Sequence, residues 1–384
     1  MCLDGGLRHS ICMPATLQRE DMMHKAKKCA VYAMMTFFAA IGASASRAAD
    51  DEVLFEGKAT VAFVGYSGTV SRWNAIDFPV FKKWMKIYAP NVEVKTYDPQ
   101  GNAANQVSMA KSALVARVDV LNIASFQEAP TTILTAAKQA KVPVLLYIFI
   151  PDKILPGSVS GLVGTDPFEI GKSQGQYVLD HASKGARVAI VNGDLSTTYA
   201  RLQHEGMLSV LQPAFNSGHF KLVADRSADG WLTAKAQAQV SSILTANQDG
   251  IDVLIMGNDD MSQGALSALR MASLEKKVMV LGQDGSIAGL RNILEGKQTA
   301  TAYRNLYFEA KSLATATAYK LANKPVPNDF YVKQQKIGTE EVPFRPTPVT
   351  VIDRSNIDLV LKDGMATREQ LCEGMPATVG APCN

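Results

Sequence analysis

Apolar and polar residues alternate along the chain in blocks typical of βαβ units. Short runs rich in Val, Ile and Leu carry few polar residues, as strands buried on both faces do. These runs span residues 60–66, 92–97, 118–125, 142–150, 186–194, 220–226, 251–259 and 278–284. Helical patterns fill the gaps, for example at residues 104–117, 129–140, 261–273 and 286–295. The alternation predicts an α/β fold in which helices cover both sides of parallel sheets.

The second half of this pattern repeats the first half in the same order. The matching segments are ATVAFVG (59–65) with ARVAIVN (186–192), DVLNIAS (119–125) with DVLIMGN (252–258), and KVPVLLY (141–147) with KVMVLGQ (277–283). We therefore predict two similar, doubly wound parallel-sheet lobes. Ligands of such sheets bind beyond the carboxyl ends of the strands, so we expect a ligand cleft between the lobes.

The N-terminal segment has the pattern of an export signal. Three lysines within residues 25–28 precede an apolar stretch at 29–46, and SRA at 46–48 resembles a cleavage site. A buried or membrane-spanning helix is the alternative, but the positive flank and the small-residue end count against it. We expect residues 1–48 to be a signal peptide and leader, and the mature protein to lie in the periplasm.

Removal of the leader changes the charge balance. The whole chain has 39 Lys and Arg against 36 Asp and Glu, and residues 1–48 hold six basic and three acidic residues, which leaves 33 of each sign. The mature chain is then neutral overall. This balance argues against nucleic acid or a membrane surface as a partner.

The cysteines predict one disulfide bond. Three of the five lie in the leader, so Cys372 and Cys383 remain as a close pair near the C-terminus. An even pair in an exported protein favours a disulfide. A zinc site needs more ligands than this pair offers, and no histidine stands nearby, so we expect no metal.

Planar polar groups and indole rings gather where the predicted strands end. The residues concerned are Ser67, Arg72, Trp73, Trp231, Asn258, Asp284 and Arg304. Carboxylate, amide and guanidinium groups can each span two neighbouring hydroxyls, and an indole face can cover the C–H face of a sugar ring. The set therefore suits a neutral polyhydroxylated ligand.

Structural roles remain open for several of these residues. Asp284 opens the segment DGSIAGL, which is a good helix entrance, so it can also serve as a helix N-cap. Trp73 and Trp231 can belong to the core, and Arg304 can form an exposed ion pair. Asp260, beside Asp259, is interpreted as a solvated or capping residue rather than part of a cation site.

Catalytic motifs do not assemble in the sequence. No phosphate-binding loop of the form G-x-x-x-x-G-K-[ST] is present, and GYSG at 65–68 is one residue short of a nucleophile elbow. Ser67 also lacks a histidine that follows a strand end. We therefore expect a binding protein that is not an enzyme and carries no cofactor.

The segments around these residues resemble the periplasmic sugar-binding proteins of bacterial ABC transporters, which are type I periplasmic binding proteins. The likeness is strongest to their D-xylose-binding branch. It is carried by SRW (71–73), ADGWLTAKA (228–236), residues 243–269, GQDGSIAGLRNI (282–293), GKQTATAYRN (296–305) and residues 341–364. The resemblance implies two lobes joined by a three-segment hinge.

The boundaries that we predict follow from this arrangement. The N-terminal lobe takes residues 57–165 and 303–335, and the C-terminal lobe takes residues 166–302 and 336–352. Residues 353–384 form a C-terminal tail.

The resemblance also implies ligand roles. Arg72 corresponds to an arginine that binds sugar oxygens, Trp231 to a ring-stacking tryptophan, and Asn258 and Asp284 to hydroxyl-binding groups. Arg304 stands where the xylose binders have a lysine.

Two departures from the xylose branch concern the ligand. Tyr147-Ile148-Phe149 replaces Tyr-Asp-Arg, and Thr197 and Tyr199 replace an acidic residue and an asparagine. Phe149, Thr197 and Tyr199 are therefore further candidates for ligand contact. The more apolar wall suggests a sugar with a methyl or unsubstituted edge, such as a 6-deoxy sugar, while a hexose or polyol remains open.

The function that follows is that of a monomeric substrate-binding component, which delivers a neutral monosaccharide to an ABC permease in the membrane. The alternative is a periplasmic sensor that presents the sugar to a chemoreceptor or a sensor kinase. Both functions use the same cleft, so the sequence does not separate them.

Overall fold

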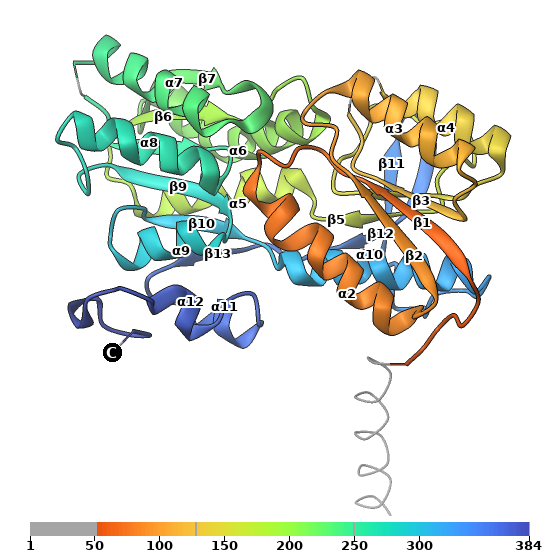
Figure 1. Cartoon of the computed structure of the whole chain (residues 1–384). Helices are drawn as coiled ribbons and strands as arrows, with labels where there is room; N and C mark the ends of the chain where they lie inside the picture. The colour runs from red at the N-terminus through yellow and green to blue at the C-terminus, as the bar shows by residue number, and fades with distance from the viewer. Residues whose placement is uncertain (1–51, 127–128, 249, 384) are drawn as a thin grey trace, which may run out of the picture. The chain divides into compact units, whose positions relative to one another are not determined.

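The structure is a computed structural model that describes residues 52–126, 129–248 and 250–383 (Figure 1). The predicted signal peptide, residues 1–48, lies outside the described residues. Two sheets, each flanked by helices, make up the part of the chain from Val53 onward. The prediction of two α/β lobes is confirmed.

The first sheet has seven strands in the order β11-β12-β5-β4-β3-β1-β2. All its pairings are parallel except that of β11 with β12. The strands are β1 (Ala59–Val64), β2 (Val92–Tyr97), β3 (Val120–Ile123), β4 (Val144–Tyr147), β5 (Gly161–Gly164), β11 (Lys333–Ile337) and β12 (Glu340–Pro346). The helical segments of this lobe are η1 (Trp73–Asp77), α2 (Phe78–Tyr88), α3 (Ala103–Val115), α4 (Ala129–Ala140) and α10 (Leu306–Leu321).

The second sheet has six strands in the order β13-β10-β9-β8-β6-β7, and only β13 runs antiparallel to its neighbour. The strands are β6 (Arg187–Asn192), β7 (Lys221–Ser227), β8 (Val253–Met256), β9 (Met279–Asp284), β10 (Ala300–Tyr303) and β13 (Thr350–Asp353). Its helical segments are α5 (Pro167–His181), α6 (Thr198–Asn216), η2 (Asp229–Trp231), α7 (Thr233–Ala246), α8 (Asp259–Met271) and α9 (Ile287–Leu294).

Apolar strands and polar caps explain these elements locally. β8 is Val-Leu-Ile-Met and is buried at every position, as expected of a strand covered by helices on both faces. α5 begins at Pro167, whose fixed φ suits the first turn, and the Asp166 side chain accepts from the amide of Phe168 at 3.1 Å. The polar residues that follow the strands are thus held at helix entrances.

The chain passes between the sheets three times, at residues 164–167, 303–306 and 346–350. The third crossing corrects the prediction that residues 336–352 belong to the C-terminal lobe. β12 pairs with β5 and β11 in the first sheet, and only β13 joins the second sheet. The polar edge strand β11, Lys-Gln-Gln-Lys-Ile, has no apolar run that would have marked it.

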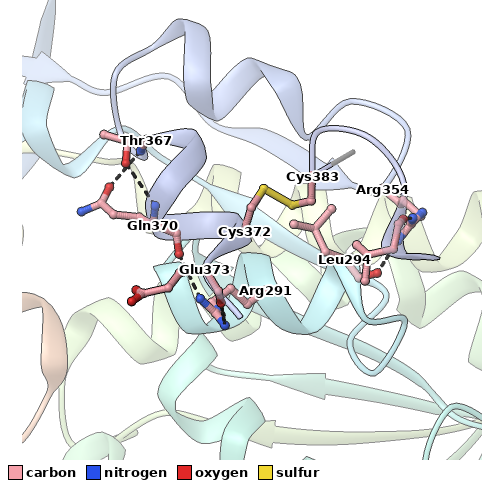
Figure 2. The surroundings of a disulfide bond; sticks show 9 residues. Arg291, Leu294, Arg354, Thr367, Gln370, Cys372, Glu373 and Cys383 are labelled. Carbon is pink, nitrogen blue, oxygen red and sulfur yellow. Dashed lines mark hydrogen bonds between the residues drawn. A yellow bond between two sulfur atoms is a disulfide. The ribbon is translucent and has the colours of Figure 1, made fainter. Parts of the chain in front are cut away.

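The C-terminal tail packs beside α9 (Figure 1). It contains α11 (Asp358–Lys362), α12 (Arg368–Cys372) and η3 (Ala377–Val379). Figure 2 shows that Cys372 and Cys383 form a disulfide and that Arg291 of α9 donates to the carbonyls of Gln370 and Glu373, at 3.2 and 2.6 Å. The tail is thus tied covalently to itself and by hydrogen bonds to the second lobe.

Candidate functional site

A cavity between the lobes contains about 350 Å³ that is free of protein atoms, part of which is open to solvent. Its lining includes all six residues that the sequence predicts as principal ligand contacts, together with Phe149 and Tyr199. The complete lining is Tyr66, Val70, Arg72, Trp73, Ile148, Phe149, Tyr199, Trp231, Asn258, Gln283, Asp284 and Arg304.

Two further candidates from the sequence do not line this cavity. Ser67 lies 2.7 Å, oxygen to oxygen, from the hydroxyl of Thr69 in its own loop. Thr197 caps α6, where its hydroxyl accepts from the amide of Ala200 at 3.2 Å. Both residues therefore have local hydrogen bonds, and their contact with a ligand stays a prediction.

Arg72 is the centre of a buried ion-pair network. Its Nε and Nη2 donate to the two carboxylate oxygens of Asp77 at 2.8 and 2.9 Å, and Nη2 also donates to Glu309 at 2.9 Å. Asp77 and Glu309 have no exposed surface, and they also accept from the hydroxyls of Tyr147 and Thr165. Burial alone would lower the pKa of Arg72, but the two carboxylates raise it well above its usual value.

Arg304 makes a second buried ion pair, with Asp284. Its Nε and Nη2 donate to one carboxylate oxygen, Oδ1, at 3.1 and 2.8 Å, and its guanidinium lies over the Tyr199 ring at 5.4 Å. Arg304 is 2% exposed, which excludes the exposed ion pair considered from the sequence. Burial raises the pKa of Asp284, but the charges of Arg304 and Arg72 outweigh burial and lower it, so this carboxylate is ionised.

Asp284 is not the N-cap of the helix that follows it. Ser286 takes that role in α9, because its hydroxyl accepts from the amide of Gly289 at 3.0 Å. Asp284 instead has a φ of 100°, in the left-handed region that residues other than glycine rarely adopt. Ile148 and Trp231 also line the cavity with positive φ, of 64° and 60°. Such strain is typical of functional sites.

Several buried polar atoms of the cavity lining have no hydrogen-bond partner among the described residues. They are Arg72 Nη1, Tyr199 Oη, Trp231 Nε1, Gln283 Oε1 and Arg304 Nη1. An unsatisfied buried group typically costs about 1–3 kcal/mol. A ligand that supplied both hydroxyl donors and hydroxyl acceptors would remove this cost.

Asn258 and Asp284 add to this set. Asn258 Oδ1 caps α8 by accepting from the amide of Met261 at 2.8 Å, and its Nδ2 group donates no hydrogen bond within the described residues. The hydrogen bonds that Asp284 accepts within the described residues all end on Oδ1. Its Oδ2 is therefore available to accept from a ligand.

Aromatic rings shape the rest of the cavity. Trp231 meets Tyr199 edge to face, with ring centroids 5.9 Å apart. A Cβ at Gly193 would lie 2.2 Å from the Trp231 ring, so the glycine makes room for the indole. Trp73 is more a core residue than a wall, because it is 2% exposed and packs against Phe63.

Sequence reasoning missed Tyr66, Val70 and Gln283 as lining residues. Tyr66 stacks on Phe149, with ring centroids 4.9 Å apart. Tyr66 and Gln283 stand at the carboxyl ends of predicted strands, so position alone could have indicated them.

Within residues 52–126, 129–248 and 250–383, no three His, Cys, Asp or Glu side chains are placed to hold a metal ion. In the same residues, no helix has the length and apolar character that spanning a membrane requires.

Comparison with known proteins identifies the family and several relatives of this chain. A sequence profile described as "Periplasmic binding protein domain" matches residues 61–325. A D-xylose-binding periplasmic protein of Escherichia coli is 29% identical over 305 residues, which cover 79% of this chain and 89% of that protein. A ribose import binding protein of Salmonella typhimurium is 31% identical over 205 residues, covering 53% of this chain and 66% of that protein.

A solved structure gives the same fold. It is an ABC transporter solute-binding protein from Clostridium phytofermentans with bound β-D-glucose, and its TM-score is 0.70 at 25% identity. The match covers 81% of this chain and 99% of that one.

Proposed function

The chain belongs to the periplasmic binding protein domain family, and on this premise we propose that its interlobe cavity binds a neutral monosaccharide. The proposed role is that of a monomeric, periplasmic substrate-binding component, which delivers the sugar to an ABC permease. The observation that carries the proposal is the set of buried polar atoms, on five residues of the cavity lining, that have no hydrogen-bond partner among the described residues. Hydroxyl groups, which donate and accept, match that set.

The charges around the cavity support a neutral ligand. Arg72 and Arg304 carry two positive charges, while Asp77, Asp284 and Glu309 carry three formal negative charges, all within one hydrogen-bonded or ion-paired network. The arginines are thus already compensated. An anionic sugar acid would add a further buried negative charge, which is costly unless a new cation pairs with it.

The apolar wall supports a deoxy sugar. Ile148 and Phe149 are 2% and 8% exposed and line the cavity on the first-lobe side. A hydroxyl that faced them without a partner would cost about 1–3 kcal/mol, whereas a methyl group would gain from burial. We therefore propose that the protein prefers a 6-deoxy sugar to its parent hexose.

The relatives favour uptake as the biological role. The Salmonella protein is named an import binding protein, and the Clostridium structure is that of an ABC transporter component that holds a monosaccharide. The cavity lining offers no Ser, Cys or His nucleophile beside a base, so we propose binding without catalysis.

A thermal-shift screen of the mature protein, starting at residue 49, tests the proposal. The panel contains monosaccharides, deoxy sugars, polyols and sugar acids. We expect stabilisation by one or more neutral sugars, because a ligand that binds only the folded state raises the melting temperature. Stabilisation by sugar acids alone would reject the neutral-sugar proposal, and stabilisation by no member would reject sugar binding.

A further inference from the structure

Among the described residues, two polar contacts join the lobes outside the cavity. In the first, here named the Asp260 clasp, the backbone amide and the hydroxyl of Ser71 donate to the two carboxylate oxygens of Asp260, at 2.8 and 2.9 Å. Ser71 precedes η1 in the first lobe, and Asp260 lies in the first turn of α8 in the second lobe. One carboxylate thus holds two donors of a single residue across the cleft.

The second contact, here named the Asp152 clasp, lies between other elements of the two lobes. Asp152 follows β4 in the first lobe, and its Oδ1 accepts from the Thr198 hydroxyl and from Arg201 Nη2, both at 2.7 Å. Thr198 and Arg201 belong to α6 in the second lobe. The Asp152 side chain is 61% exposed and that of Arg201 is 34% exposed, so solvent weakens this ion pair.

We infer that Asp260 and Asp152 are positioning residues, which set ligand affinity by stabilising the closed arrangement of the lobes. Neither residue lines the cavity, and both clasps consist of protein groups alone. The clasps can therefore form before a sugar enters. Contacts that exist only when the lobes meet raise the closed population.

This inference rests on the proposed function, and it makes a distinct claim about affinity. If the sugar binds the closed form, the apparent Kd is the intrinsic Kd divided by the closed fraction. Loss of a clasp lowers the closed fraction, and it therefore raises the apparent Kd of every sugar by the same factor. Loss of a group that touches the sugar changes the order of preference instead.

The Asp260 clasp has a second effect on the site. Ser71 directly precedes Arg72 and Trp73, which line the cavity. The hydrogen bond that holds the Ser71 backbone amide therefore also helps to hold these two residues in position. The Thr233 hydroxyl donates to the Asp260 carbonyl at 2.9 Å, which ties the clasp to α7 of the second lobe. Ser71 and Asp260 thereby link elements on both sides of the cavity.

The experiment measures lobe closure without sugar and affinity with sugar. Spin labels on Lys111→Cys of α3 and Gln212→Cys of α6, both exposed sites, report the interlobe distance distribution, because Cys372 and Cys383 are already bonded to each other. The variants are Asp260→Ala, Ser71→Ala and Asp152→Ala. Glu93→Ala is the control, because Glu93 is 62% exposed and pairs with Lys95 within one lobe.

We expect each clasp variant to lower the closed fraction of the sugar-free protein and to raise Kd by about two- to tenfold, by the same factor for every sugar that binds. Glu93→Ala should change neither quantity. A sugar-free protein with no closed fraction, or an unchanged closed fraction in all three variants, would overturn the inference. Unequal factors among sugars would overturn it too, and would make the altered residue a ligand contact. Because the sugar-free distances need no ligand, a failure of the sugar proposal is distinguishable from a failure of the clasps.

Discussion

Arg304 donates two hydrogen bonds to one oxygen of Asp284 and none to the other. The bonds reach Oδ1 at 3.1 and 2.8 Å, from Nε and Nη2. A bidentate pair would use both oxygens, whereas this arrangement leaves Oδ2 free for a ligand. Arg304 therefore fixes the orientation of the Asp284 carboxylate before any sugar binds.

Asp284→Ala should abolish tight sugar binding while the fold persists. A charged acceptor contributes about 1.5–3 kcal/mol for each hydrogen bond, so loss of two sugar hydroxyl contacts lowers affinity by about 100-fold or more. Calorimetric titration of the best sugar from the screen measures this change. Asp353→Ala serves as the control, since this carboxylate lies outside the cavity, in β13. Unchanged affinity in Asp284→Ala would remove Asp284 from the site.

Arg72→Ala should destabilise the protein strongly, by about 3–5 kcal/mol, because it leaves Asp77 and Glu309 buried beside an unfilled space with less compensation. Urea unfolding of the sugar-free protein measures this loss. The matched control is Arg187→Ala, whose pair with Asp252 is 43% exposed on both side chains and should contribute about 1 kcal/mol or less. Equal losses of unfolding free energy in the two variants would contradict the claim that burial makes the Arg72 ion pairs more important than the exposed pair.

Ile148→Asn should reverse the predicted preference for a deoxy sugar. The asparagine places an amide where a hydroxyl of the parent hexose can pair, and it tolerates the positive φ at this position better than a β-branched residue does. Titration of the wild type and the variant with D-fucose and D-galactose, which differ at one hydroxyl, measures the ratio of affinities. We expect at least several-fold preference for the deoxy sugar in the wild type and a smaller or inverted ratio in the variant. Tighter binding of the parent hexose by the wild type would refute the prediction.

Stability should fall as pH rises through the range set by Asp259. This carboxyl is 1% exposed, and burial, with a further contribution from the Asp284 charge, raises its pKa to about 7. Between its unfolded pKa, near 4, and 7, the folded state holds a proton that the unfolded state has lost, so folding loses up to about 1.4 kcal/mol per pH unit. Unfolding at pH 5 to 8 should show a smaller decline in Asp259→Asn than in the wild type. Identical slopes would contradict the assignment.

Loss of the disulfide should affect stability more than ligand binding. The bond closes a loop with a sequence separation of 11 residues, which constrains the unfolded chain by at most about 2–3 kcal/mol. Cys372 and Cys383 lie in the tail and do not line the cavity. Denaturant unfolding and calorimetry of Cys372→Ser together with Cys383→Ser should therefore show lower stability and nearly unchanged affinity. A tenfold loss of affinity would show that the tail controls the site.

The fold was predictable because strands buried on both faces form apolar runs, and because the two halves repeat those runs in order. Two of the strands that were not predicted show why: β5 is the short sequence Gly-Leu-Val-Gly, and β11 is a polar edge strand rich in Lys and Gln. Pairing of β12 with β5 joins residues that lie far apart in the chain. No local pattern encodes that pairing, so the third crossing was misplaced.

The site residues that could be predicted are those whose place at the end of a strand puts them in the cleft. Arg72, Asn258 and Asp284 follow buried strands, and the geometry of parallel sheets brings strand ends together. The partners of Arg72 were not predictable, since Glu309 is 237 residues away. Ser67 and Thr197 do not line the cavity, and short-range hydrogen bonds, to a neighbouring hydroxyl and a helix amide, hold their side chains. Such local bonds compete with a ligand for hydroxyl groups.

The most direct test of the account is a crystal structure of the mature protein grown with the best-binding sugar from the screen. The account predicts one sugar ring in the interlobe cavity, within hydrogen-bond distance of Asp284 Oδ2 and Asn258 Nδ2 and in contact with the Trp231 ring. It also predicts that Arg72 Nη1 and Arg304 Nη1 lie within hydrogen-bond distance of sugar oxygens. A sugar bound elsewhere, or an interlobe cavity that stays empty at a saturating sugar concentration, would contradict it.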